Sequence, residues 1–319
     1  MVVRGQSVAR GHIFSLAFSL ALSWILFGAC SDETDPATPD LGGGLVDASI
    51  GYDGTPPWVP EGDGPWAGAL CSATSLDGIT FKERGQFLTR AGVANLFYTS
   101  SKELIATYQY FSFEDQSLFN VIAYSISKDE GDTWSGPHKL VIEGLTGEVP
   151  VVDPTLVQLD SGDLRLYFTY HRPGDKQPSL ASAKSSAIDV AFQYEEGPRV
   201  QIDGVAVLDP AVVLHEDIWH YFAPRHDGDE TKSLHATSTD GLAFTLGDDL
   251  ALEISMLGAA VSAEGGIRFY GQGKGGIGSV FSADGNSWLM DDGVRAVGVD
   301  PGVARLNDGH YLMVYGCPK

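Results

Sequence analysis

Basic residues are scarce in this sequence. Its 319 residues include 20 Lys and Arg against 42 Asp and Glu, which gives a formal net charge of −22 at pH 7. A surface with such an excess of acid repels phosphate backbones. We therefore expect no nucleic-acid partner, and the even spread of the acids along the chain favours a role in solubility over an acidic docking surface.

The motifs of several large enzyme classes are also missing. The chain has no GxSxG nucleophile elbow, no HExxH zinc motif and no P-loop. The glycines of GQGKGGIG (271–278) follow an expected strand but open no helix, so they do not form a dinucleotide-binding turn. Helical periodicity is hard to find beyond residue 67, which indicates an all-β domain.

Long apolar runs are absent except for residues 13–29. This run follows a segment that carries Arg4 and Arg10 but no acid, an order typical of an export signal. It ends in LFGAC, which resembles a bacterial lipobox with Phe27 where leucine is usual. We expect residues 1–29 to be a lipoprotein signal peptide and Cys30 to be the lipidated residue. Ser31 then favours the outer membrane or cell surface; a plain signal peptide and an uncleaved anchor are the alternatives.

Residues 30–66 are predicted to be a flexible acidic linker rich in Gly and Pro. They contain few apolar residues, so they cannot bury enough surface to offset the entropy of ordering. The fold is therefore expected in residues 67–319, which are enough for one domain with a core.

A short Ser–x–Asp pattern repeats along this domain. It occurs as SLDGITF (75–81), SKDEGDTW (127–134), STDGLAF (238–244) and SADGNSW (282–288), each ending in an aromatic residue. The Asp separations are 52, 111 and 44 residues, so a degenerate copy is expected near residue 185, where AKSSAIDVAF stands. Ser and Asp can accept backbone N–H groups across a tight turn that Gly permits, so we interpret the five copies as structural turns.

A second repeat alternates with the first. An Asp-Pro pair opens a short strand, a turn follows, and an aromatic-rich strand completes a hairpin in 151–170, 207–225 and 298–316; 92–111 and 257–273 fit without Asp-Pro. Each unit thus contains four strands, A and B from this hairpin and C and D around the Ser–x–Asp turn. Five such units predict an all-β, five-bladed β-propeller.

The ends of the domain predict how the ring closes. The domain begins with a C–D pair and finishes with an A–B pair, and together these make one blade. Cys71 would lie at the start of strand C and Cys317 at the end of strand B, side by side in an antiparallel pair. Because an exported protein meets an oxidising compartment, we predict a Cys71–Cys317 disulfide.

The A-strand starts and B–C loops should meet at one mouth of the central channel. The candidate catalytic acids there are Asp153, Asp209 and Glu148, because close carboxylates can have their pKa values driven apart into an acid and a base. Candidate substrate-binding residues are His171, Arg172, Arg225, His226, Asp300 and Lys274. The Asp-Pro aspartates could instead only cap the strand starts, and calcium in the acid-lined channel is a further possibility.

The Ser–x–Asp turns resemble the Asp box, or BNR repeat, of sialidases and other propellers. The pattern of DPTLVQLDSGDLRLYFTYH resembles the five-bladed glycoside hydrolases of the arabinanase/xylosidase (family 43), invertase and mannoside phosphorylase groups. This resemblance implies a glycosidase-like protein that acts on an oligo- or polysaccharide. Together with the lipobox, it leads us to expect a monomeric surface lipoprotein. A non-catalytic carbohydrate- or protein-binding propeller is the alternative, and a sialidase-like hydrolase is a weaker one.

Overall fold

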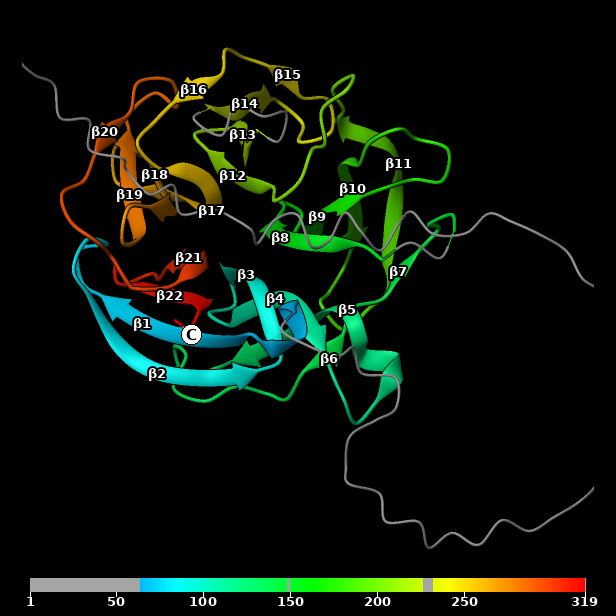
Figure 1. Cartoon of the computed structure of the whole chain (residues 1–319), viewed down its shortest axis with the longest axis horizontal. Helices are drawn as coiled ribbons and strands as arrows, with labels where there is room; N and C mark the ends of the chain where they lie inside the picture. The colour runs from blue at the N-terminus through cyan, green and yellow to red at the C-terminus, as the bar shows by residue number, and fades with distance from the viewer. Residues whose placement is uncertain (1–63, 148–149, 226–231, 319) are drawn as a thin grey trace, which may run out of the picture. The chain divides into compact units, whose positions relative to one another are not determined.

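A computed structural model describes residues 64–147, 150–225 and 232–318 of the chain. They form five antiparallel sheets that surround one axis, so the predicted five-bladed β-propeller is confirmed (Figure 1). The inner strands close the ring, because β3 contacts β8, β8 contacts β12, β12 contacts β17, β17 contacts β21, and β21 contacts β3.

Four blades are each built from one continuous stretch of chain. Blade 1 contains β3 (Ala91–Tyr98), β4 (Leu104–Phe111), β5 (Phe119–Ser127) and β6 (His138–Lys139). Blade 2 contains β8 (Val152–Gln158), β9 (Leu164–Tyr170), β10 (Ser179–Ser185), β11 (Phe192–Val200) and the parallel edge strand β7 (Ile142–Glu143). Blade 3 contains β12 (Ala211–His215), β13 (Ile218–Pro224), β14 (Lys232–Ser238), β15 (Thr245–Leu246) and β16 (Leu250–Ala251). Blade 4 contains β17 (Ser255–Ala263), β18 (Gly266–Gly273), β19 (Gly276–Ser282) and β20 (Leu289–Met290).

Blade 5 combines strands from both ends of the domain. Its order is β2 (Phe81–Thr89), β1 (Ala69–Ser75), β22 (Tyr311–Gly316) and β21 (Val299–Arg305). β1 pairs antiparallel with β22, and Cys71 forms a disulfide with Cys317 as the sequence predicted. Two short 3₁₀ turns, Pro65–Ala67 and Gln116–Leu118, are the helical segments of the described residues, and no helix among them is long and apolar enough to cross a membrane.

The core lies between neighbouring blades. Five apolar clusters fill the five interfaces, and large side chains such as Tyr108, Phe168, Phe222 and Phe269 are fully or almost fully buried. Alternate residues of each central strand face one neighbouring blade or the other, so most of these strands carry apolar residues on both faces.

The Ser–x–Asp segments form tight turns between strands C and D. In the turn after β14, Ser238 Oγ accepts the N–H of Gly241 at 3.0 Å, and Asp240 Oδ1 accepts the N–H groups of Leu242 and Ala243 at 2.8 and 2.9 Å. The same bonds occur after β1, with small variations after β5 and β19. These bonds lower the pKa of each Asp, and all of them serve the turn itself.

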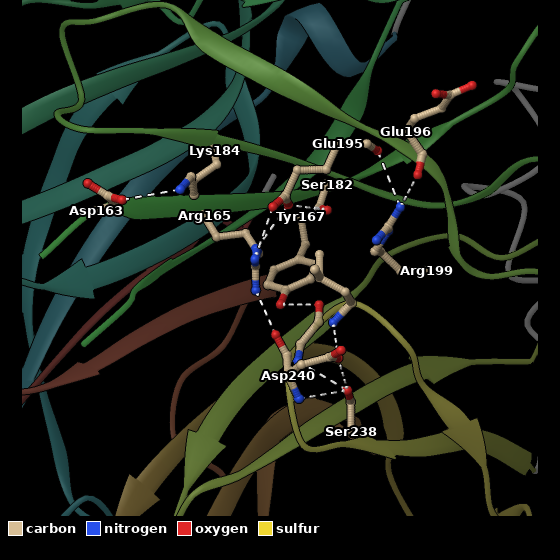
Figure 2. Close-up of polar contacts among 12 residues, drawn as sticks. Asp163, Arg165, Tyr167, Ser182, Lys184, Glu195, Glu196, Arg199, Ser238 and Asp240 are labelled. Carbon is tan, nitrogen blue, oxygen red and sulfur yellow. Dashed lines mark hydrogen bonds and ion pairs between the residues drawn. The ribbon is translucent and has the colours of Figure 1, made fainter. Parts of the chain in front are cut away.

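These turns also fasten neighbouring blades together. Figure 2 shows Arg165 of blade 2 donating to both oxygens of Glu195 at 2.9 and 3.0 Å and to the carbonyl of Asp240 in blade 3 at 3.0 Å. Tyr167 donates to the carbonyl of Gly241 at 2.8 Å, and Ser182 donates to Glu195 at 2.7 Å. The Ser–x–Asp turn therefore presents its carbonyl groups to the preceding blade.

Candidate functional site

Corresponding positions of the inner strands converge at one end of the central channel. Asp153, Asp209 and Asp300 stand there in blades 2, 3 and 5, and each precedes a proline. Val93 and Leu257 take the corresponding places in blades 1 and 4. Around the ring, Asp153 and Asp209 are therefore neighbours, and a blade with an apolar residue separates each of them from Asp300.

The backbone turns at this point in an unusual conformation. The φ angles of Asp153, Asp209 and Asp300 are 58°, 52° and 49°, and that of Val93 is 47°. In blades 2 and 5 the ladder is interrupted between Val152 and Thr155 and between Val299 and Gly302, so the Asp-Pro pair forms a β-bulge. Aspartate tolerates the left-handed region better than most residues, whereas a β-branched valine is strained there. The repeated bulge changes the direction of the side chain at this position in each of these blades.

The three aspartates line a narrow cavity together. Its volume is about 20 Å³, and its walls also include Val93, Leu257 and the three prolines. A space of about this size holds roughly one water molecule, so a sugar ring does not fit within this layer. Any saccharide that meets these carboxyl groups must lie over the opening, with the cavity beneath it.

The surroundings raise the pKa values of two of the aspartates. Burial, with the charges of Asp209 and Asp300, raises the pKa of Asp153 well above its usual value. Burial and the charge of Asp209 raise the pKa of Asp300 to about 7. The backbone N–H of Asp209 donates to Asp153 Oδ2 at 3.3 Å. Asp153 therefore holds its proton more firmly than an exposed carboxyl group does, and it lies beside other carboxyl groups, the arrangement that acid–base chemistry requires.

Hydrogen bonds between blades hold the inner strands in place around the cavity. Thr155 Oγ1 donates to the carbonyl of Pro210 at 2.5 Å, which joins β8 to the start of β12. Asn95 Oδ1 accepts the N–H of Leu156 at 3.0 Å, which joins β3 to β8. Both bonds come from residues within two positions of the bulge, so the bulges of blades 1 to 3 are linked to one another.

The other predicted ligand-binding residues have different surroundings. Arg172 Nη2 lies 3.1 Å from Asp175 Oδ1, and Arg225 Nη1 lies 2.6 Å from Asp249 Oδ2. His171 Nε2 donates to the carbonyl of Asp175 at 2.9 Å. These three residues and the exposed Lys274 do not line the cavity, whereas Asp300 does. Glu148 and His226 lie outside the described residues, as does Cys30.

Sequence reasoning missed the partners of the mouth residues. Asp249 and Asp175 engage the arginines, and a further pair joins Arg90 to Glu114, with Nη1 lying 2.5 and 2.6 Å from the two carboxylate oxygens. The repeat alignment could have identified Val93 and Leu257 as the apolar counterparts of the aspartates. No set of three or more His, Cys, Asp or Glu side chains in the described ranges is arranged to hold a metal ion.

Comparison with known proteins supports the fold class. No known protein family matches the sequence, and no curated protein is similar to it. Among solved structures, a protein of unknown function from Dyadobacter fermentans is 14% identical, with a TM-score of 0.55 over 78% of this chain and 84% of its own. Zg3597, a family 117 glycoside hydrolase from Zobellia galactanivorans, is 12% identical, with a TM-score of 0.53 over 80% of this chain and 92% of its own.

A third solved structure was determined with a sugar. An exo-β-1,3-galactanase from Phanerochaete chrysosporium, crystallised with β-1,3-galactotriose, is 9% identical, with a TM-score of 0.53 over 77% of this chain and 64% of its own. At these identities the likeness shows the shared β-propeller fold. The function must be argued from the site.

Proposed function

We propose that this protein is a glycosidase-like, carbohydrate-acting propeller whose catalytic groups are the aspartates at the channel opening. The observation that carries the proposal is the convergence of Asp153, Asp209 and Asp300 in one narrow cavity, where the pKa values of Asp153 and Asp300 are raised. The fold shared with glycoside hydrolases and the galactotriose bound to one of them make a saccharide the favoured ligand.

In this proposal the aspartates divide the proton transfers between them. Asp153, kept protonated, donates its proton to the glycosidic oxygen as the bond to the anomeric carbon breaks. A water in the cavity attacks that carbon and gives its proton to Asp209, which acts as the base beside Asp300. Separate acid and base carboxyl groups are what glycoside hydrolysis needs.

The test is a panel of aryl glycosides and natural oligosaccharides that includes furanosides, xylosides, fructosides, mannosides and galactosides. We expect one class to be hydrolysed, and we expect Asp153→Asn and Asp209→Asn each to lower kcat by about 10²–10⁴-fold. Asp160→Asn, at an exposed aspartate on the β8–β9 turn, is the matched control and should keep full activity. Ca²⁺ and EDTA additions test whether activity needs calcium in the acid-lined channel. Hydrolysis that survives both aspartate substitutions would remove these residues from the mechanism.

A second candidate is a non-catalytic carbohydrate- or protein-binding propeller. The observation that favours it is the pairing of Arg172 with Asp175 and of Arg225 with Asp249, which leaves these guanidinium groups already engaged at the mouth. It also weakens a sialidase-like arrangement, which needs arginines available for a carboxylate. Saccharide binding without turnover on the whole panel would select this candidate.

Lipid anchoring through Cys30 remains part of the proposal. The Cys71–Cys317 disulfide supports an oxidising, exported location. Expression in a bacterial host with a radiolabelled fatty acid tests the anchor: the label should enter the wild-type protein and be absent from Cys30→Ala. If the label enters both the wild-type protein and Cys30→Ala, or neither of them, the lipoprotein assignment is contradicted.

A further inference from the structure

Two blade interfaces of the propeller use the same set of side chains. Figure 2 shows the set in blade 2, where Arg165 and Tyr167 of β9 and Ser182 of β10 meet Glu195 of β11 and the turn of blade 3. In blade 4, Arg268 Nε donates to Asp291 at 3.1 Å, Ser279 donates to Asp291 at 2.7 Å, and Tyr270 donates to the carbonyl of Gly78 in blade 5 at 2.9 Å. The strand registers agree, because Arg165 pairs with Lys184 as Arg268 pairs with Phe281.

The two corners differ in the side chains that the following blade supplies. The residue that pairs with the serine of the turn is Trp219 opposite Ser238 in blade 3, but Tyr311 opposite Ser75 in blade 5. The residue next to it on the inner strand is Leu214 in blade 3 and Arg305 in blade 5. Blade 5 thus has a smaller ring and an arginine where blade 3 has an indole and an aliphatic side chain.

These differences leave one corner filled and the other open. At the blade 2–3 corner the Arg165 side chain is 7% exposed, whereas the Arg268 side chain at the blade 4–5 corner is 16% exposed. At the blade 4–5 corner, a cavity of about 330 Å³ is bordered by Leu76, Glu264, Arg268, Phe281, Arg305 and Tyr311. Small-molecule sites begin at about this volume. The cavity lies among the A–B and C–D turns, at the end of β21 remote from Asp300.

The polar groups around this cavity include both donors and acceptors that are still available. Arg305 is exposed, and its side chain makes no hydrogen bond or ion pair with any other described residue. Glu264, on the β17–β18 turn, is also exposed and has no such partner in the described ranges. Arg268 is held by Asp291 and lies over the Phe281 ring, 5.4 Å from its centroid. An arginine, a carboxylate and an aromatic side chain therefore border one space.

The charges decide which ligand suits this combination. An anion in the cavity would meet the carboxylates of Asp77 and Glu264, and a cation would meet Arg268 and Arg305. A neutral polyol ring avoids both conflicts, because its hydroxyl groups can accept from a guanidinium and donate to a carboxylate. Its C–H faces can pack on Phe281 and Leu76, the two larger apolar side chains of a mostly polar lining.

We propose that the blade 4–5 corner is a second ligand site that binds a neutral sugar unit through the side chains of Arg305, Glu264 and Phe281. This site is separate from the channel carboxyl groups and does not depend on hydrolysis. It would hold a glycan on the opposite face of the propeller from Asp153.

The experiment is ligand-observed saturation-transfer NMR on the wild-type protein with D-galactose, D-xylose and L-arabinose, and with D-glucuronate and D-glucosamine as charged probes. Arg305→Leu and Tyr311→Trp introduce at this corner the residues that blade 3 has at the corresponding positions, Leu214 and Trp219. We expect a neutral sugar to bind the wild-type protein, and each substitution to weaken its Kd by about tenfold or more, since a hydrogen bond to a charged group or the cavity itself is lost. Asp160→Asn, the exposed control, should leave this binding unchanged.

Three results would overturn the proposal. The first is that no neutral sugar binds at millimolar concentration. The second is that Asp153→Asn loses binding while Arg305→Leu keeps it. The third is that glucuronate binds more tightly than the neutral sugars. Thermal melts of both variants check that they fold. Arg305→Leu changes an exposed side chain, so this variant alone still tests the proposal if Tyr311→Trp does not fold. If the wild-type protein binds a neutral sugar but hydrolyses no glycoside of the panel, the channel mechanism is contradicted and this site still stands.

Discussion

Cys71 and Cys317 are joined by a disulfide with a Cα–Cα distance of 5.1 Å, although 246 residues separate them in the sequence. Both belong to blade 5, where β1 and β22 lie side by side. The bond closes almost the whole described chain into one loop.

Removal of this disulfide should destabilise the domain strongly. A cross-link restricts the unfolded chain more as the loop grows, and a loop of this length corresponds to about 5–6 kcal/mol. We expect Cys71→Ser/Cys317→Ser to lower the free energy of unfolding by that order, as measured by urea denaturation. The reduced wild-type protein should match the double variant, and a midpoint that does not move on reduction would show that strand pairing alone closes the ring.

The Arg165–Glu195 pair should be sensitive to loss of one partner. The two side chains are 7% and 20% exposed, so Glu195→Ala leaves a largely buried guanidinium without its carboxylate. We expect a loss of about 3 kcal/mol in urea denaturation. Replacing both residues by methionine should recover much of this loss, because the uncompensated charge is then gone.

The exposed pair of Lys184 and Asp163 in the same blade is the matched control. Their side chains are 46% and 31% exposed, and their separation is 3.3 Å. Lys184→Ala should cost less than about 1 kcal/mol. If it costs as much as Glu195→Ala, burial is not the reason for the effect at Arg165.

The histidine pair of blade 3 should make the protein sensitive to mild acid. His220 Nδ1 lies 3.2 Å from His235 Nε2, both rings are buried, and burial lowers the pKa of His235 to about 4. Below about pH 6.5 the histidines of the unfolded chain bind protons, whereas the buried His235 of the folded protein does not. The free energy of unfolding should therefore fall by roughly 3 kcal/mol as the pH drops from about 6.5 to 4. In His220→Phe/His235→Phe the melting temperature should change less across this range; an equal change would assign the acid sensitivity to other groups.

Asp300 should produce the opposite dependence. Its pKa is raised to about 7 from 3.8, so the folded protein retains a proton that the unfolded chain loses, and stability should fall as the pH rises from about 4 to 7. Asn at this position carries no titrating proton. We expect Asp300→Asn to melt at a higher temperature than wild type at pH 8 and close to it at pH 4. A variant that is less stable at pH 8 would mean that the ionised carboxylate has a stabilising partner.

The sequence predicts the ring well because each blade repeats the same local chemistry. Ser–x–Asp turns at 75, 127, 238 and 282, together with Asp-Pro strand starts, are short-range signals that survive without tertiary context. The position of Cys71 and Cys317 then follows from strand order alone.

The site is less predictable because it depends on which side chains meet across loops. Nothing in the local pattern pairs Arg225 with Asp249, which comes 24 residues later beyond a turn and a strand. The positive φ of Asp153 is likewise unexpected, since a residue before proline usually takes an extended conformation. The open blade 4–5 corner depends on Arg305 and Tyr311 standing where blade 3 has Leu214 and Trp219, and this correspondence requires the strand register.

The shared blade also sets an order on folding during synthesis. β1 and β2 leave the ribosome before every other strand of the propeller, yet the partner of β1 is β22, which follows all of them. Until then β1 presents an unpaired edge, the kind of surface that templates aggregation. A chain interrupted before Tyr311 keeps that edge unpaired, so completion of the last strand removes the aggregation hazard of the first.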